Sequence, residues 1–517
     1  MDLIKENIEY EQLLGEKIID NVTNDEFVIP DTHPDVNEIL LVDTKGKIKK
    51  CEVMAEKIYI EGELNHNVMY TAKDVEEERE VYCVNYTSKF NSVVEVKDSS
   101  HEIECESECY VDHMNCNIIN ERKIRIGGII KLKCETYQKC DAKIVKDVDN
   151  EKDIQFAKKP AEVDKIANIV NKDLLGDCNI NVSGDLPEIS EILKCDVVFK
   201  KRDVRLLEDS VKFLAKVGIK VLYKAKESKE ICCVEDEVIL EEECEAYGVN
   251  SSMENYSKFF VENTEYSVRD NELGEAKDIK VELVVKAYCK VMNKVQIDII
   301  EDAYSPSMVL NMEKKNYEMN VVHKQAHDEV VVKHEIELED DAKIKDILFS
   351  KGEVLVTEKK VLEDKVVIEG LLKVCLVYNT DSKKQEIYAT EEEIPFSCNL
   401  DMLGTKIHMQ CIAKAVLDEL ECEVKRGEIK LKAIIDVYCR VCYNIHSEFL
   451  INLEKGEGTI PDKKASITIY VVQSGDTLWK IAKKYNTTIE SLCKINDMND
   501  KDIKADMKLI IPGRALI

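Results

Sequence analysis

One strand pattern occurs three times in this chain of 517 residues and constrains its fold more than any other feature. The three stretches are KIYIEGELNHNVMY (57–70), SVKFLAKVGIKVLY (210–223) and KVVIEGLLKVCLVY (365–378), and their final tyrosines lie 153 and 155 residues apart. Nearly every second position in each stretch is apolar or small. Such alternation is typical of a β-strand with one buried face, because successive side chains point to opposite sides. A slip of one residue would expose the whole apolar row, so the pattern also fixes the register.

A small residue stands in the middle of each stretch, namely Gly62, Ala215 or Gly370. A small residue inside a strand suggests a β-bulge or a close approach of two backbones. The likeness also extends upstream, where DVNEIL, EISEIL and KIKDIL stand at the same distance before each stretch. We expect these segments to form a short helical turn at the start of each unit.

Each unit closes with a second strand-like stretch that ends in a cysteine. These stretches are KIRIGGIIKLKC, DIKVELVVKAYC and EIKLKAIIDVYC, and they end at Cys134, Cys289 and Cys439. A cysteine that recurs at a strand end is better explained by burial in the core than by metal or redox chemistry. The pair Cys439 and Cys442 forms a C-x-x-C motif, but a structural zinc site needs a second pair of ligands and none is evident.

The repeats predict a mainly β fold, with three β-rich domains in tandem and a small β-α-α-β module at the C-terminus. Residues 161–175 are expected to form a helix in the first connector, and KGEGTIPDKK (455–464) is expected to be a hinge because glycine and proline interrupt it. The predicted boundaries are an N-terminal lead at 1–28, repeats at 29–145, 181–300 and 336–450, connectors at 146–180 and 301–335, a hinge at 451–466 and the module at 467–513.

Composition narrows the possible partners and the compartment. The formal net charge is -30, with acidic and basic residues interspersed, and such a field argues against nucleic acid and anionic membranes as partners. We expect no secretory signal and no membrane insertion, because the N-terminus lacks a basic and an apolar region and no apolar run is long enough to span a bilayer. The 20 cysteines, without a signal, favour a reducing compartment.

The C-terminal module has its own local signals. Asp476 is a good N-cap for a helix that begins near Leu478, and Thr487 with Glu490 suggests a capping box for a second helix. The apolar stretches ITIYVV and LIIP on either side are expected to pair as strands. Trp479 could stack on a sugar, but its place at a helical apolar spacing favours a role in the small core.

The stretch YVVQSGDTLWKIAKKYNTTIESLCKIN, followed by KLIIP, resembles the LysM family over about 45 residues. This resemblance implies binding of N-acetylglucosamine-containing glycans, such as peptidoglycan, through two loops. The chain has Ala505-Asp506 where the family usually has Pro-Gly, so the module could instead bind a protein. The expected binding surface consists of Gln473, Ser474, Gly475, Asp476, Thr477, Trp479, Asn496, Asp506 and Met507.

The repeats resemble the SPOCS domain, as seen in IEGELNHNVMYTAKD, NERKIRIGGIIKLKCE and their counterparts. Together with a C-terminal LysM module, this arrangement is similar to spore coat morphogenesis proteins of endospore-forming Firmicutes. The resemblance implies work in the cytosol of the mother cell, at the surface of the forespore. It also implies that the LysM module binds the ATPase that polymerises into the basement layer of the coat, alongside other coat proteins.

We therefore expect a non-enzymatic scaffold on which the LysM module is a flexibly tethered hook. The sequence shows no phosphate loop, no H-E-x-x-H and no G-x-S-x-G motif, and it indicates no catalytic, cofactor or metal residues. Two alternatives stay open. One is a glycan-binding protein of the cell wall or cortex, and the other is a peptidoglycan hydrolase that uses LysM for targeting.

Overall fold

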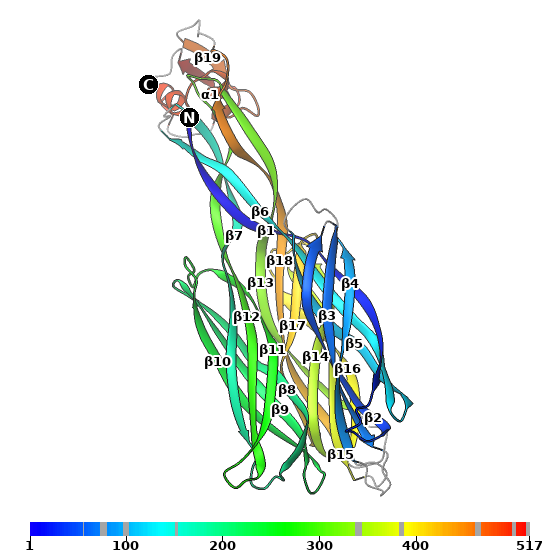
Figure 1. Cartoon of the computed structure of the whole chain (residues 1–517). Helices are drawn as coiled ribbons and strands as arrows, with labels where there is room; N and C mark the ends of the chain where they lie inside the picture. The colour runs from blue at the N-terminus through cyan, green and yellow to red at the C-terminus, as the bar shows by residue number, and fades with distance from the viewer. Residues whose placement is uncertain are drawn as a thin grey trace.

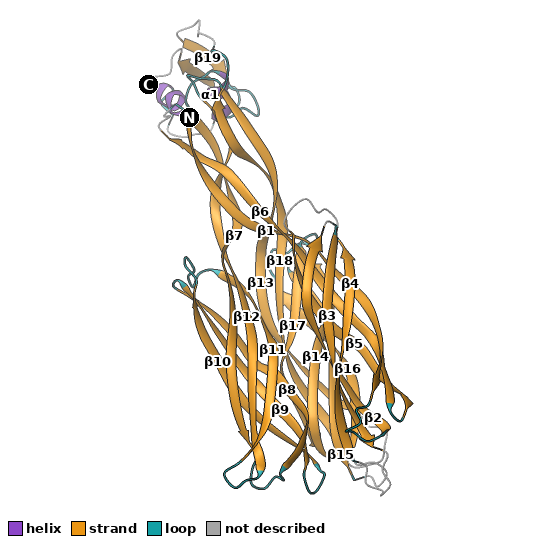
Figure 2. Ribbon diagram, in the orientation of Figure 1, coloured by secondary structure: helices purple, strands orange, loops and turns teal. Residues whose placement is uncertain are grey.

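The computed structural model describes the chain except for residues 55, 73–79, 97–102, 150–152, 337–343, 382–386, 426, 461–466, 499–502 and 513–517. A broad β-rich body continues into a narrow stem of long strands, and a small module with two helices lies at the end of the stem (Figure 1, Figure 2). The N-terminus lies beside this module. The mainly β fold predicted from the sequence is confirmed.

Each repeat contributes six strands. The first contains β1 (Asp2–Val28), β2 (Val36–Met54), β3 (Lys57–Ala72), β4 (Val81–Glu95), β5 (Ile103–Asn120) and β6 (Lys123–Asp149). The second contains β7 (Gln155–Asn181), β8 (Ile189–Leu207), β9 (Ser210–Ala225), β10 (Ile231–Glu245), β11 (Glu254–Asp270) and β12 (Ala276–Tyr304). The third contains β13 (Leu310–Ile336), β14 (Ile344–Leu362), β15 (Lys365–Thr380), β16 (Ile387–Asp401), β17 (Gln410–Lys425) and β18 (Glu428–Lys455).

The six strands of a repeat form two three-stranded antiparallel sheets that pack as a sandwich. In the first repeat the strand orders are β2-β3-β4 and β1-β6-β5, and the other two repeats follow the same plan. The three repeated stretches at 57–70, 210–223 and 365–378 lie in the central strands β3, β9 and β15. Their alternating apolar side chains are buried, and Val211, Phe213, Val217, Ile219 and Val221 are fully inaccessible to solvent. The period read from the sequence is therefore confirmed in the packing.

The small residues in these strands mark a close approach of side chain and backbone. A Cβ atom on Gly62 would lie 2.3 Å from the ring of Phe90 and 2.6 Å from the carbonyl oxygen of Lys47. The register of β2 against β3 also shifts between Ile48 and Lys50, directly opposite this glycine. The expectation of a bulge or a close approach is confirmed, because here both occur.

The prediction of a helix at residues 161–175 is wrong, because this segment lies within β7 and pairs with β12. A bulge leaves Ala167 without a partner in the ladder. The extra residue moves the buried face from odd to even positions, so Val163 is buried before the bulge and Val170 and Leu174 after it. The resulting apolar spacing imitates the period of a helix.

The predicted helical turns at the start of each unit are strands for the same reason. In β2 the register against β3 shifts between Val36 and Glu38 and again between Ile39 and Leu41. In β8 and β14 two shifts occur at the corresponding places; Lys343, the first residue of KIKDIL, lies outside the described residues. Two bulges three residues apart give apolar side chains a helix-like spacing in a strand.

The three sandwiches pack against one another around a common axis. One apolar cluster contains Met69, Leu222 and Val377, which the repeat spacing relates to one another, and each of the three is fully buried. Beyond the sandwiches, the long strands β1, β6, β7, β12, β13 and β18 continue together as the stem. Its apolar interior contains Ile8, Ile144, Val163, Ile297, Met319 and Phe449, one from each of these strands.

Charged side chains, rather than apolar ones alone, join the three repeats. Asp43, Asp196 and Lys351 occupy the same position in successive repeats, since 153 and 155 residues separate them. Lys351 Nζ lies 2.8 Å from Asp43 Oδ1, Lys194 also pairs with Asp43, and Lys45 pairs with Asp196. Burial alone would raise the pKa of Asp43, but the lysines around it hold that pKa below its ordinary value.

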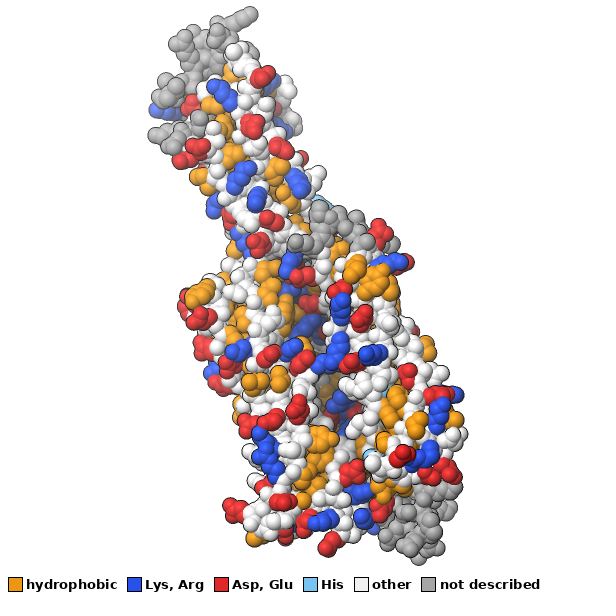
Figure 3. Space-filling view, in the orientation of Figure 1, with side chains coloured by type: hydrophobic (Ala, Val, Ile, Leu, Met, Phe, Trp, Pro, Cys, Tyr) orange, Lys and Arg blue, Asp and Glu red, His pale blue; other side chains and the backbone are white. Residues whose placement is uncertain are grey.

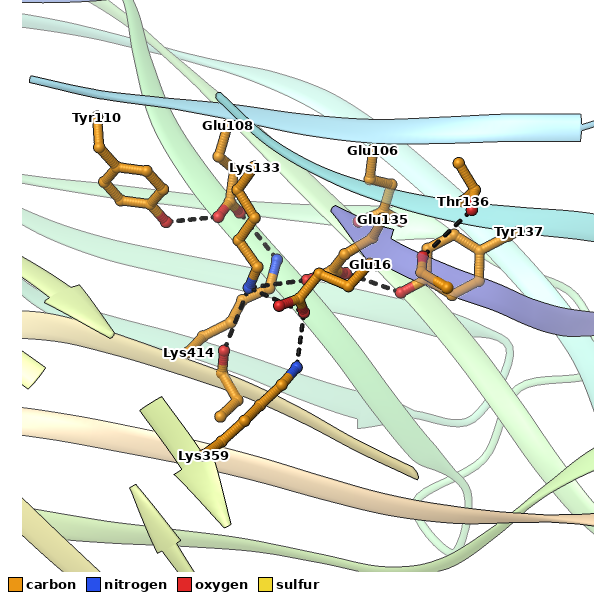
Figure 4. A network of polar contacts seen from close by, with 12 residues as sticks. Glu16, Glu106, Glu108, Tyr110, Lys133, Glu135, Thr136, Tyr137, Lys359 and Lys414 are labelled. Atoms are coloured by element: carbon orange, nitrogen blue, oxygen red, sulfur yellow. Dashed lines mark hydrogen bonds and ion pairs between the residues drawn. The ribbon is translucent and has the colours of Figure 1, made fainter. Parts of the chain in front are cut away.

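A second network of charged side chains includes Glu108, Lys133, Glu135 and Lys414 (Figure 4). Glu108, Lys258 and Lys414 are equivalent, because each pairs across the ladder with the residue before the repeated cysteine. Lys414 Nζ lies 2.8 Å from Glu108 Oε1, and Lys258 pairs with Glu106. Equivalent positions thus carry opposite charges in different repeats. The charged surface of each repeat is therefore complementary to the neighbouring repeats, whereas two identical copies would place like charges together.

We expect Lys351→Met to lower the free energy of unfolding by about 3–5 kcal/mol, because it removes one of the two lysines that pair with the largely buried Asp43. Chemical denaturation followed by circular dichroism measures this change. Lys333→Met, at an exposed position on β13, is the matched control and should change stability by less than about 0.5 kcal/mol. An equal effect of the two substitutions would contradict a structural role for the buried charges.

Acid should weaken the interface between repeats. Burial raises the pKa of Glu108 and Glu135, but the lysines around each carboxylate outweigh it and lower both values from 4.5 to about 2. A carboxylate whose pKa is lower in the folded than in the unfolded state stabilises the fold fully at pH values above its pKa in the unfolded state. This stabilisation is lost as the pH falls through the pKa in the folded state.

We therefore expect the free energy of unfolding to fall as pH decreases from 4.5 toward 2, by an amount on the order of 2–3 kcal/mol for each group. Denaturant titrations at a series of pH values test this. Glu135→Gln should be less stable than the parent at pH 7 and should lose less stability over the acid range. A parallel pH profile for the two proteins would refute the assignment.

Candidate functional site

The module at the end of the stem is built from four short elements. These are β19 (Ile467–Val471), α1 (Leu478–Lys484), α2 (Ile489–Ile495) and β20 (Lys508–Pro512). The strands pair antiparallel, and the helices pack against them around Leu478, Ile481, Ala482, Leu492, Leu509 and Ile511. The β-α-α-β order predicted from the sequence is confirmed.

The helix caps lie one residue beyond the predicted positions. Thr477 caps α1, and its Oγ1 accepts a hydrogen bond from the backbone N–H of Lys480 at 3.2 Å. Thr488 caps α2 and accepts from the backbone N–H of Ser491 at 3.0 Å. The predictions of Asp476 as N-cap and of Thr487 with Glu490 as capping box are wrong, because Asp476 has other partners and Thr487 is fully buried.

The first predicted loop, residues 473–477, is a tight turn closed by Asp476. The carboxylate of this residue accepts from the Tyr470 hydroxyl at 2.7 Å and from the backbone N–H of Gln473 at 2.9 Å. The hydrogen bonds to Gln473 and Tyr470 lower the pKa of Asp476, so it stays charged. The side chains of Gln473, Ser474 and Thr477 are exposed, and Gly475 turns the chain with a φ of +86°.

The second predicted loop meets the first through backbone hydrogen bonds. The N–H of Asp506 donates to the carbonyl of Val472 at 2.8 Å, and the N–H of Val472 donates to the carbonyl of Met507 at 2.9 Å. Asp506 is exposed and has a φ of +68°, a conformation that favours glycine. The middle of this loop, residues 499–502, lies outside the described residues.

Asn496 has a structural role at the end of α2. Its Nδ2 donates to the carbonyls of Leu492 and Ile510, both at 2.8 Å, and its Oδ1 accepts from the backbone N–H of Ile510 at 2.7 Å. The amide therefore joins α2 to β20. Asn496 supports the loop that follows it, whereas the residues of the first loop and Asp506 present atoms to solvent.

Trp479 contacts the stem. Its Nε1 donates to Asp302 Oδ2 at 2.9 Å, and its ring meets the ring of Tyr304 edge-on at a centroid distance of 4.9 Å. Lys483 Nζ lies 2.6 Å from the same aspartate, and the Tyr304 hydroxyl donates to the carbonyl of Thr487 at 2.8 Å. The expected core role of Trp479 is confirmed, but that core extends into the stem.

The module is therefore docked on the end of β12 and is not the flexibly tethered hook expected from the sequence. Burial raises the pKa of Asp302, but hydrogen bonds from Lys483 and Trp479 outweigh it, so the net shift is downward and the carboxylate stays charged. The sequence offered no signal for Asp302 and Tyr304, since they end a strand more than 150 residues before the module. Of the predicted hinge, β18 includes residues up to Lys455, and residues 461–466 lie outside the described part.

The single tryptophan of the chain allows a direct test of this docking. We expect Asp302→Asn combined with Tyr304→Ala to expose Trp479, with a red shift of its fluorescence and stronger quenching by acrylamide. Asp298→Asn, at an exposed position of the same strand, is the matched control and should leave the spectrum unchanged. Identical quenching of the two variants would mean that the module does not dock in solution.

The cysteines that recur at strand ends are core residues. Cys134, Cys289 and Cys439 are buried in the sandwich cores, with at most 1% of each exposed, as their recurrence at strand ends predicted. Within the described residues, no group of three or more His, Cys, Asp or Glu could hold a metal ion. In the same part of the chain, no helix is long and apolar enough to cross a membrane.

Comparison with known families agrees with this architecture. The family model described as SipL, SPOCS domain matches residues 35–119, 188–269 and 343–425, and the LysM domain model matches residues 470–512. No curated protein and no solved structure matches the chain. The three SPOCS matches cover strands β2 to β5, β8 to β11 and β14 to β17. The long strands that form the stem lie outside the matches. The two domain types fit a protein associated with the spore coat that carries a peptidoglycan-binding module.

Proposed function

Because the chain carries three SPOCS domains of the SipL type followed by a LysM domain, we propose that it is a non-enzymatic scaffold of spore coat assembly. In this proposal it works in the cytosol of the mother cell, at the surface of the forespore. Its LysM module binds the ATPase of the coat basement layer, and the β body offers a surface to other coat proteins. One observation carries the proposal: the module is held at the end of the stem, away from the three sandwiches (Figure 1).

The docked position of the module suggests how such a scaffold would work. The contacts of Trp479, Lys483 and Thr487 with the stem fix the orientation of the module, so less conformational freedom is lost when a partner binds. A polymerised partner would present many identical sites, and many weak contacts along it would add up to firm recruitment. The charges of the body are interspersed on the face shown in Figure 3, as expected for a solvated scaffold surface.

A second candidate function is binding of peptidoglycan or another N-acetylglucosamine-containing glycan. The side chains of Gln473, Ser474 and Thr477 are exposed at the loop through which LysM domains are expected to hold sugars. Asp506 places a charge beside this loop in a backbone conformation that favours glycine. That charge favours the protein partner over the sugar.

We expect a fluorescent fusion of the chain to form a ring around the forespore in sporulating cells and to lose that ring when residues 465–517 are removed. The physical reason is that the proposed recruitment contact lies in the module. Fluorescence microscopy measures the distribution, and immunoblotting confirms that the truncated protein is present in equal amounts. The exposed substitution Lys333→Met serves as the full-length control.

Signal at the cell periphery or septum would contradict recruitment to the coat and would support the glycan alternative. Co-sedimentation of the purified protein with peptidoglycan sacculi separates the two ideas further. Sedimentation that depends on residues 465–517 would support glycan binding, and release of reducing ends from the sacculi would support a hydrolase instead.

A further inference from the structure

An open cavity of about 530 Å³ lies in the third repeat, where the loop before β17 meets the strands β13 and β18. Polar and basic side chains line it, and the principal ones are His323, Lys406, His408, Gln410, Tyr443 and His446. Its volume falls within the range of about 300–1,000 Å³ that small-molecule sites occupy. The cavity is separate from the LysM module, to which none of these residues belongs.

The lining contains no aspartate or glutamate, although the chain has 103 of these residues. It holds three of the nine histidines and one lysine. Three carboxylates lie near the cavity without lining it. Glu318 pairs with His446 across the ladder and accepts a hydrogen bond from Asn444 Nδ2 at 2.8 Å. Burial and the negative charges of Glu162 and Asp164 raise the pKa of Tyr443. The wall of the cavity therefore offers mainly donors and positive charge.

The corresponding positions of the other repeats are different. Gln410 lies opposite Cys442, which is three residues after the repeated cysteine. In the first and second repeats, the residues opposite the equivalent position are Glu104 and Glu254. His446, seven residues after that cysteine, corresponds to Asp141 and Gln296. At these two positions the third repeat has a glutamine and a histidine, whereas three of the four counterparts in the other repeats are carboxylates.

A bulge directs one of the histidines. His323 is the extra residue of β13 between the paired positions Val322 and Lys324. The first and second repeats have a bulge at the same place, but there the extra residues are Leu14 and Ala167. Bulges commonly turn a side chain toward a functional site. Here the imidazole lies against Tyr443 with ring centroids 6.4 Å apart, and its Nε2 lies 3.1 Å from the carbonyl of Leu403.

Hydrogen bonds fix the amide groups of the wall. Asn320 Nδ2 donates to Gln410 Oε1 at 3.2 Å and to Asn444 Oδ1 at 2.8 Å. Because the carbonyl oxygen of Gln410 is occupied, its NH₂ group remains as a donor. Burial raises the pKa of Tyr443, so its hydroxyl also keeps a proton to donate.

From this lining we propose that the cavity binds a small multivalent oxyanion of the phosphate type. Lysine, histidine, amide and phenol donors suit an oxyanion that accepts several hydrogen bonds, and charge-assisted bonds are the stronger ones. A metal ion fits less well, since in the described part of the chain no three or more His, Cys, Asp or Glu side chains, those of the cavity included, are placed so that they could hold one. The net charge of -30 opposes anions only weakly at this site, because salt screens distant charges over about 8–10 Å.

Isothermal titration calorimetry of the full-length protein with sodium tripolyphosphate tests the proposal. We expect one binding site per chain, and about tenfold weaker binding for Lys406→Gln and for His446→Gln. Glu318→Gln removes a negative charge opposite His446 and should strengthen binding. Lys333→Gln, exposed on β13 and outside the lining, is the matched control and should bind as the parent does.

Absence of binding at millimolar tripolyphosphate, or equal binding by the parent and the Lys406 and His446 variants, would overturn the proposal. Zinc titrated in the absence of phosphate provides the second arm. Binding of zinc that depends on the histidines, without binding of tripolyphosphate, would overturn it in favour of a metal site. Circular dichroism of each variant tests whether the substitution leaves the fold intact.

Discussion

The three repeats depend on charged side chains that are buried or half-buried where the repeats meet. Asp43 pairs with Lys351 and Lys194, and Asp196 pairs with Lys45, at one level of the shared axis, whereas Glu108 pairs with Lys414 at another. Removing charges from water is costly, and only close opposite charges offset that cost. The apolar cores of the sandwiches could form in any copy of the repeat. The charged networks instead require unlike residues at equivalent positions: two aspartates and one lysine in the first network, and one glutamate and two lysines in the second. They therefore specify the order in which the repeats assemble.

This constraint has a consequence for the rest of the molecule. With the sandwiches fixed around one axis, the strands β1, β6, β7, β12, β13 and β18 leave the body side by side and form the stem (Figure 2). The stem in turn presents Asp302 and Tyr304 at the end of β12, where they receive Trp479 and Lys483. The orientation of the LysM module thus follows from contacts made far away in the sequence. A scaffold built in this way holds its binding module in a fixed orientation relative to the stem.

Much of the fold could be predicted from local patterns, and the failures share one cause. The alternation of apolar residues in β3, β9 and β15 predicted these strands, their buried faces and their repetition. The small residue Gly62 predicted a close approach, which in the structure is made by the ring of Phe90. The segments misjudged as helical, such as 161–175, are strands with bulges. A bulge inserts one residue and shifts the buried face, which turns a period of two into one that resembles a helix. Single-residue irregularities of this kind depend on the partner strand.

The sequence by itself determined the repeated β units, the β-α-α-β module and the residues of its exposed turn, because these follow from periodicity and from contacts within a few residues. Only the tertiary structure decided which charges meet on the axis, where Trp479 docks, and that His323 and His446 share one cavity. These pairings join residues that lie more than one hundred positions apart. Local sequence patterns do not indicate contacts between residues so far apart in the chain. These contacts form only when the strands have paired in register and the repeats have packed together.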